Sequence, residues 1–252
     1  MFPNDLCQIC ILYCLSPLHA GAGQAIGPVD LPIQRERHTG WPQVQASGVK
    51  GAFRDWFLRY YTALGKDCLN KGIQAEELTK RVFGREEETP IEAGDKQGGQ
   101  AGAVSVSDAR LLAFPVRSDV APFVWVTCPA ILTRLSRDMK LCLPDQDLPP
   151  VTPKGPNTYI ALLGGNKPQI ILEDLVVTPE AGAEETKSSV DLFRRFAPNV
   201  DRLLLITDED FSFLVRTATE IQPQIRIDHE TGTTVDGSLR YQELLPSDSV
   251  LY

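Results

Sequence analysis

One stretch, Ser16 to Arg59, constrains the chain more than any other part of it. It follows an apolar run that ends at Leu15, and it opens with three closely spaced glycines. An isolated acid, Asp30, stands between two prolines, and a cluster of cations follows within a few residues. Closely spaced glycines and prolines interrupt helices and strands, so we expect a loop whose backbone comes close to a ligand. The cations predict that this ligand is a polyanion, with the rest of the chain as its scaffold.

The end of this stretch has the pattern of an amphipathic helix. Apolar residues recur at helical spacing from Val49 to Tyr60, and Ser47 is a good N-cap residue just before them. Lys50 and Arg54 are four residues apart and therefore share a face of the first turns. Unpaired N–H groups at a helix start favour anions, so the pattern predicts a phosphate site. An ordinary amphipathic helix with solvated cations is the alternative.

The glycines Gly21, Gly23 and Gly27 also suggest a dinucleotide-binding fingerprint. That motif opens directly into a helix and needs an acid about 20 residues further on. Here Pro28 follows the third glycine, and Pro32 disfavours helix at the residue before it. We therefore expect a loop at this position and no dinucleotide site.

Charge is distributed unevenly along the 252 residues. The formal net charge of −8 argues against a protein that coats nucleic acid non-specifically. Locally, however, residues 34–59 hold five Lys or Arg and two acids, whereas residues 76–95 hold seven acids and three bases. A basic segment in an acidic protein fits one defined nucleic-acid track, and it fits equally a solvated surface of uneven charge.

The N-terminal residues and the six cysteines bear on compartment. The apolar run 6–18 lacks a basic segment before it and is too short to span a bilayer, so we expect a buried first strand. Cys7, Cys10 and Cys14 have a spacing that could hold a metal, but no second cysteine pair follows at zinc spacing, which favours small buried thiols. Without a disulfide framework the chain is expected in a reducing compartment, the cytoplasm, with no membrane partner.

The remaining pattern predicts an α+β fold. Strands are expected over 7–15, 104–106, 111–116, 123–127, 159–163, 170–177, 202–207, 224–228 and 238–245. Helices are expected over 48–64, 74–83, 188–196 and 208–218, and from Pro129 onward. A loop is expected over 85–102, and a proline-rich one over 143–157.

Several runs carry a resemblance to a known family. They are His19-Ala-Gly-Ala-Gly, Val29-Asp30-Leu-Pro-Ile-Gln-Arg35-Glu-Arg37-His38-Thr-Gly40 and Ser47-Gly-Val-Lys50-Gly51-Ala-Phe-Arg54, with further matches over 105–118, 126–129 and 230–248. The chain resembles the repeated backbone subunit of type III-B (Cmr) CRISPR effector complexes, which are RAMP-superfamily proteins. The resemblance implies a single RAMP domain over 1–252 with an RRM-like (ferredoxin-like) core and large insertions, including a thumb β-hairpin expected within 159–177. The glycine-rich C-terminal part of the family would be missing from this chain.

The resemblance also implies a cleavage site. Asp30 matches the family's essential cleavage aspartate and would bind a divalent metal, Mg²⁺ or Mn²⁺. From the residues alone, Asp30 could be a general base toward a ribose 2′-OH, a metal ligand, or a loop acid that hydrogen-bonds its own turn. His19 would assist proton transfer or orient the target strand, and Tyr241 and Glu243 would lie near the scissile bond.

A second set of residues would contact RNA. Ser47, Lys50 and Arg54 match the positions that hold the guide backbone in RAMP proteins, although Ala46 and Gly48 depart from the usual pattern. In the preceding cluster, Arg35, Arg37 and His38 would either bind phosphates or form salt bridges.

Together these features predict an endoribonuclease subunit that binds guide crRNA and cleaves complementary target RNA at regular intervals. Its partners would be both RNAs, other copies of itself in a filament, and other subunits of the effector complex. The alternative is a structural guide-binding subunit without catalysis, in which Asp30 would be dispensable. A guide-processing nuclease is less consistent with only three histidines and an acidic pI.

Overall fold

The computed structural model describes residues 6–23, 29–65, 72–85, 99–143, 148–182, 184 and 186–252. The chain divides into two compact units. The first comprises residues 1–43 and 110–252, and the second comprises residues 44–109. The second unit is therefore continuous in sequence and is inserted between the two parts of the first. The described residues confirm the predicted α+β class, with five helices and a large mixed sheet.

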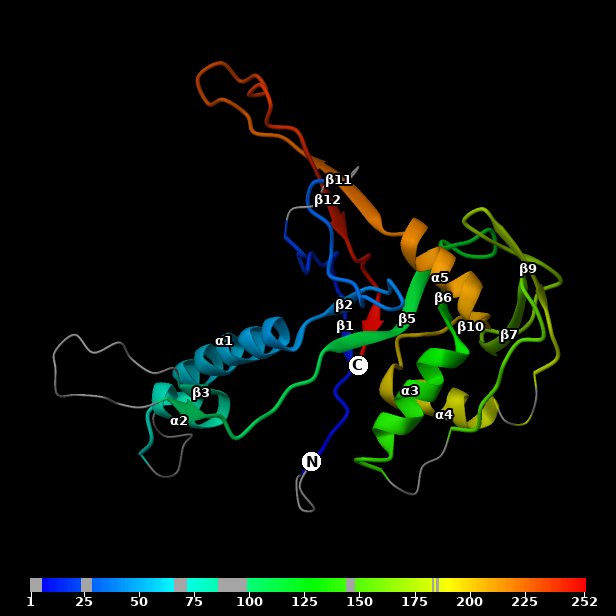
Figure 1. The fold of residues 1–252 in the computed structure, drawn as a ribbon, viewed down its shortest axis with the longest axis horizontal. Coiled ribbons are helices and arrows are strands. Elements are labelled where there is room, and N and C mark those ends of the chain that lie inside the picture. The colour runs from blue at the N-terminus through cyan, green and yellow to red at the C-terminus, as the bar shows by residue number, and fades with distance from the viewer. Residues whose placement is uncertain are drawn as a thin grey trace. The chain divides into compact units, whose positions relative to one another are not determined.

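The first unit is built on that sheet (Figure 1). Its strands run in the order β1 (Leu12–Tyr13), β13 (Val250–Leu251), β5 (Ala109–Arg117), β6 (Phe123–Thr127), β10 (Leu203–Ile206), β7 (Thr158–Leu163), β9 (Leu175–Pro179) and β8 (Ile170–Leu172). Central strands β5, β6 and β10 are mostly apolar and almost wholly buried, apart from the arginines of β5, as expected of strands covered on both faces. The pair β6 and β10 is parallel, whereas β5 pairs with β6 in antiparallel fashion.

The predicted first strand over 7–15 is much shorter than expected. Only Leu12 and Tyr13 pair, with Leu251 and Val250 of β13. Both Leu6 and Leu15 are almost fully exposed. The apolar run overestimated the strand because apolar composition does not reveal how many partner residues a neighbouring strand offers.

Three helices accompany the sheet, namely α3 (Pro129–Met139), α4 (Thr186–Phe196) and α5 (Asp208–Thr217). Proline opens α3, where its missing N–H costs nothing. The N-cap of α5 is Thr207, whose hydroxyl accepts a hydrogen bond from the Asp210 amide. Both α3 and α5 contact Trp41, whose ring lies 5.0 Å from the Arg134 guanidinium and 5.1 Å from the Phe211 ring.

A separate two-stranded sheet forms a hairpin from β11 (Glu220–Gln224) and β12 (Arg240–Leu244). Its connecting segment extends away from α5 in Figure 1. By contrast, the segment 159–177 that was expected to hold a projecting thumb lies within the large sheet as β7, β8 and part of β9. Tyr159 and Val177 are completely buried there, so this segment does not project.

The second unit contains α1 (Ala46–Leu64), α2 (Ala75–Phe83), β3 (Gly84–Arg85) and β4 (Gln100–Ala101), and β2 (Gln43–Val44) lies at its boundary. The two helices contact each other through Phe57 and Phe83, whose ring centroids are 5.4 Å apart. No strand forms over 104–106, because the Val104 amide donates to the Val82 carbonyl instead. Most of the loop predicted over 85–102, residues 86–98, lies outside the described residues, and Arg85 and Gln100–Ala101 at its two ends form strands instead. Of the proline-rich loop predicted over 143–157, residues 144–147 lie outside the described residues, and residues 148–157 form no helix or strand, as predicted.

Within the described ranges, no helix combines the length and the apolar content that crossing a bilayer requires.

Candidate functional site

Asp30 lies exposed beside β12. Its Oδ2 accepts a hydrogen bond of 2.8 Å from the backbone N–H of Tyr241. The next residue, Leu31, pairs with the same strand, since its N–H donates to the Tyr241 carbonyl and its own carbonyl accepts from the Glu243 N–H. These bonds fix the carboxylate at the edge of β12. Among the described residues, Oδ1 has no hydrogen-bond partner, so it is available to a ligand.

His19 is anchored to the same strand. Its Nδ1 lies 2.8 Å from the backbone carbonyl of Glu243. A carbonyl can only accept a hydrogen bond, so Nδ1 carries the proton and Nε2 is left to exchange one. Gly21 makes room for the ring, because a Cβ at that position would lie 2.9 Å from the imidazole Nε2. The Asp30 and His19 anchor points are two residues apart on β12, which corresponds to about 7 Å along a strand.

Glu243 itself points into the protein. Its side chain is 9% exposed, and it accepts from the Arg35 guanidinium at 2.5 Å, the Ile33 N–H at 3.0 Å and the Thr219 hydroxyl at 2.9 Å. Burial alone would raise the pKa of Glu243, but the hydrogen bonds from Arg35, Ile33 and Thr219 outweigh it and lower that pKa below its ordinary value. The carboxylate is therefore ionised and saturated with donors, which is the geometry of a structural ion pair.

Arg35 is also held by several partners. Its Nη1 donates to the Gly40 carbonyl at 2.9 Å and to the Val215 carbonyl at 3.0 Å, in addition to its ion pair with Glu243. The guanidinium thus joins the loop, α5 and β12. This arrangement argues against the catalytic role predicted for Glu243 and the RNA contact predicted for Arg35. Tyr241 contributes its backbone to the Asp30 site, and its phenol ring is exposed.

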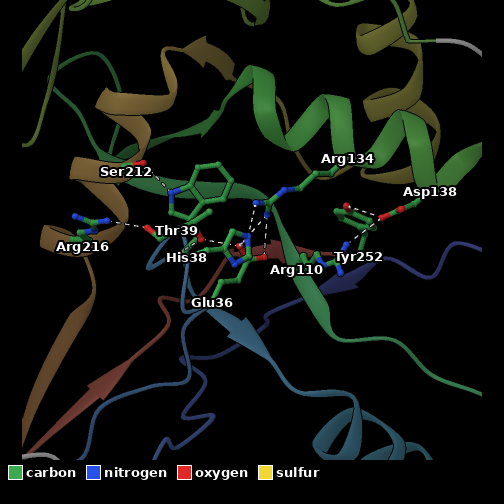
Figure 2. Close-up of polar contacts among 10 residues, drawn as sticks. Glu36, His38, Thr39, Arg110, Arg134, Asp138, Ser212, Arg216 and Tyr252 are labelled. Atoms are coloured by element: carbon green, nitrogen blue, oxygen red, sulfur yellow. Dashed lines mark hydrogen bonds and ion pairs between the residues drawn. The ribbon is translucent and has the colours of Figure 1, made fainter.

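The other two residues of the basic cluster, Arg37 and His38, have different surroundings. Figure 2 shows Glu36 at the centre of a polar network, where Arg134 Nη1 lies 3.0 and 2.9 Å from its two oxygens. His38 sits at the exposed edge of this network, with its Nε2 3.1 Å from Arg134 Nη2 and 3.5 Å from Glu36. Arg37 is exposed and takes part in no ion pair with the described residues. Of the three predicted phosphate contacts, Arg37 is therefore the one whose charge is turned to solvent.

The second unit brings the other three RNA-binding candidates together. Ser47, Lys50 and Arg54 of α1 line a pocket of about 380 Å³. The predicted N-cap at Ser47 is wrong, because α1 begins at Ala46 and Gln45 is the capping position, without a side-chain cap. Instead, the Asp108 carboxylate accepts a 2.8 Å hydrogen bond from the Ala46 N–H. Since a carboxylate already occupies this helix end, the pocket depends on its cationic side chains more than on free backbone N–H groups.

Comparison with known proteins decides the family. The model of the RAMP superfamily matches residues 11–251. The chain belongs to the RAMP superfamily. A curated RAMP relative, the CRISPR system Cmr endoribonuclease Cmr4 of Pyrococcus furiosus, is 36% identical over 251 residues, which cover 96% of this chain and 78% of that protein.

Solved structures agree with this membership. Oligomeric Cmr4 from Pyrococcus furiosus has a TM-score of 0.65 at 29% identity, covering 96% of this chain and 77% of that one. A chain of the type III-B Cmr-beta complex bound to cognate target RNA has a TM-score of 0.69 at 20% identity, covering 96% of this chain and 80% of that one, a likeness in fold.

Sequence reasoning missed three residues of this RAMP chain. Arg134 neutralises Glu36, Thr219 helps to hold Glu243, and Arg85 lines the same pocket as Lys50 and Arg54. The first two act through contacts that no local spacing reveals. For Arg85 a signal existed, because it follows Gly84 at a helix end, where a cation can turn back toward the neighbouring helix.

Proposed function

We propose that this chain is a repeated backbone subunit of a type III-B CRISPR ribonucleoprotein that binds guide RNA and cleaves complementary target RNA. The proposal is supported by membership of the RAMP superfamily and by 36% identity to a protein named as an endoribonuclease. Self-association in a filament is supported by the fold shared with oligomeric Cmr4. Regularly repeated subunits would place their cleavage sites at regular intervals along the target.

The observation that carries the proposal is the placement of Asp30 and His19 on one edge of β12. Their anchor residues, Tyr241 and Glu243, are two residues apart, about 7 Å from Cα to Cα along the strand. In an in-line displacement at phosphorus, the attacking and leaving oxygens are roughly 4 Å apart, and each needs a proton partner within about 3 Å. Two groups spaced in this way can therefore serve the two ends of one scissile phosphodiester.

In the proposed reaction the ribose 2′-oxygen attacks the adjacent phosphorus, and the bond from phosphorus to the 5′-oxygen breaks. Asp30 Oδ1 accepts the proton of the 2′-OH, while protonated His19 donates from Nε2 to the departing 5′-oxygen. The products are a 2′,3′-cyclic phosphate and a 5′-hydroxyl. Neither Glu243 nor Arg35 takes part, because their polar atoms are already paired with each other and with the backbone.

A divalent ion, Mg²⁺ or Mn²⁺, is part of the proposal. Within the described part of the chain, no three His, Cys, Asp or Glu side chains form a metal cluster. Asp30 fits the other common arrangement, in which Mg²⁺ takes one carboxylate from the protein and the rest of its ligands from substrate phosphates and water. Bound there, the ion would neutralise negative charge that develops on the phosphate.

Guide binding is assigned to the pocket formed by Ser47, Lys50 and Arg54. Two cations and a hydroxyl on one wall of a pocket suit a phosphodiester backbone, which offers charge and acceptor oxygens at every nucleotide. Reading only the backbone leaves sequence specificity to base pairing between guide and target. Arg37, exposed and unpaired among the described residues, would add a further backbone contact.

We assign the thumb to the β11–β12 hairpin in place of 159–177. Ile225, Ile227 and Leu239 near its far end are each more than half exposed, as expected of a wedge that enters a base-paired duplex. The antiparallel pair β5–β6 and the parallel pair β6–β10, with α3 directly after β6 in the chain, are consistent with the RRM-like core.

Target cleavage tests the proposal. The complex is assembled with guide RNA and Mg²⁺ or Mn²⁺, labelled complementary RNA is added, and wild type is compared with Asp30→Ala. An evenly spaced product ladder that vanishes in the variant, with target binding intact, is expected. An unchanged ladder would overturn the role of Asp30, and no ladder from either protein would identify a structural guide-binding subunit.

A further inference from the structure

The pocket of the second unit has a wall that the family motif does not include. Besides α1, its lining comes from the end of α2 and from the short sheet β3–β4, and that lining includes Arg85. Three cations, Lys50, Arg54 and Arg85, therefore face one space of about 380 Å³. No Asp or Glu is among the described residues that line it. Cationic side chains that line one pocket attract an anion.

Two glycines build this second wall. Gly84 has φ 96°, a conformation that other residues rarely adopt, and it turns the chain from α2 into β3. At Gly102, just after β4, a Cβ would lie 2.5 Å from the Phe83 carbonyl carbon and 2.7 Å from the Gly84 nitrogen. Those neighbours are backbone atoms, which cannot move aside as a flexible side chain does. Glycine is therefore required at Gly102 for β4 to lie against β3, and this contact places Arg85 at the pocket.

We infer that Arg85 is a third phosphate ligand of the RNA-binding pocket, held opposite Lys50 and Arg54 by the Gly84–Gly102 contact. The inference rests on the proposed function, since it takes the ligand to be the backbone of guide RNA. An arginine presents several donors in a planar fork and binds a phosphate at two oxygens, which a lysine cannot do. A pocket with cations on two walls can contact a backbone phosphate from both sides, whereas a single helix face can contact it from one side only.

The test is binding of the full chain to a labelled single-stranded guide RNA at several KCl concentrations. Arg85→Ala is expected to weaken binding about tenfold, as for loss of one charged hydrogen-bonding group. It is also expected to reduce the slope of log affinity against log salt by about 0.7, the value for one phosphate contact to a single strand. Arg81→Ala is the matched control, because Arg81 lies four residues before Arg85, on α2, and is exposed in an ion pair with Glu77.

Further variants separate the possible outcomes. Gly102→Ala keeps every charge yet should weaken binding as Arg85→Ala does, and Arg85→Gln replaces Arg85→Ala if the latter lowers the melting temperature. If Lys50→Ala weakens binding while Arg85→Ala behaves as Arg81→Ala, this inference is overturned and the proposed function stands. If neither Lys50→Ala nor Arg85→Ala has an effect, the proposed guide site fails together with the inference.

Discussion

Replacing Glu243 by alanine should destabilise the fold rather than abolish chemistry directly. The substitution leaves the Arg35 guanidinium without its carboxylate, and the Ile33 N–H and the Thr219 hydroxyl without their acceptor. Breaking a buried ion pair by removing one partner costs about 3–5 kcal/mol. Because the Arg35 side chain is 23% exposed, water can recover part of that loss, so we expect the lower end, about 3 kcal/mol.

For a chain of this size, 1 kcal/mol lowers the melting temperature by about 2–4 °C, so Glu243→Ala should melt about 6–12 °C below wild type. Circular dichroism melts measure the difference. Glu77→Ala is the control, because it breaks an exposed ion pair with Arg81 that contributes less than about 0.5 kcal/mol.

Two results would refute this reasoning. One is a Glu243→Ala melting temperature within about 2 °C of wild type, which would mean that the ion pair contributes nothing. The other is a Glu243→Gln variant that is fully folded at the assay temperature and has lost cleavage by more than about a hundredfold, as expected of a catalytic group. In that case Glu243 would act on the substrate after all.

Three further predictions follow from individual contacts. Because the folded-state pKa of Glu243 lies below its unfolded value, the stabilisation it provides is present above the unfolded pKa, about 4.3, and is lost as the pH falls through the lower folded pKa. Between about pH 6 and pH 3, the melting temperature of Glu243→Gln should therefore fall less than that of wild type. An equal fall in both proteins would contradict a lowered pKa of Glu243. Gly21→Ala should displace His19 and slow cleavage as much as His19→Ala does, with little change in melting temperature; a normal rate would show that the ring position is unimportant. Burial and the neighbouring Cys7 thiol raise the pKa of Cys142 to about 11. When thiol alkylation at pH 8 is followed by mass spectrometry, the exposed Cys10 should therefore be modified well before Cys142. The reverse order of modification would refute this prediction.

The apolar spacing in the sequence was enough to predict helix α1, but it did not predict which residues pack against that helix. The apolar spacing from Val49 to Tyr60 correctly predicted the helix, because periodicity is a property of one segment. Yet only Val49 is buried on α1, and Trp56 and Tyr60 are 60% and 46% exposed. Spacing identifies an apolar face, but it does not identify what covers that face.

The same limit explains the different outcomes for Arg35 and Arg37. The two residues have the same chemistry and lie two positions apart, so nothing local distinguishes them. Their roles separate because Glu243, 208 residues away from Arg35, comes to lie beside one of them. Asp30 was predicted as a site residue because the motif around it is specific, and its role stays a prediction; the hydrogen bond to β12 adds the geometry that the motif lacks.

The most direct test of the central claim is single-turnover cleavage by the assembled complex containing Asp30→Asn. The asparagine oxygen can still accept the Tyr241 N–H, so the substitution removes the charge and the basicity while it keeps the anchor. The account predicts unchanged target binding and a loss of cleavage of at least about a hundredfold, in the range for a general base. A cleavage rate within a few-fold of wild type would contradict it.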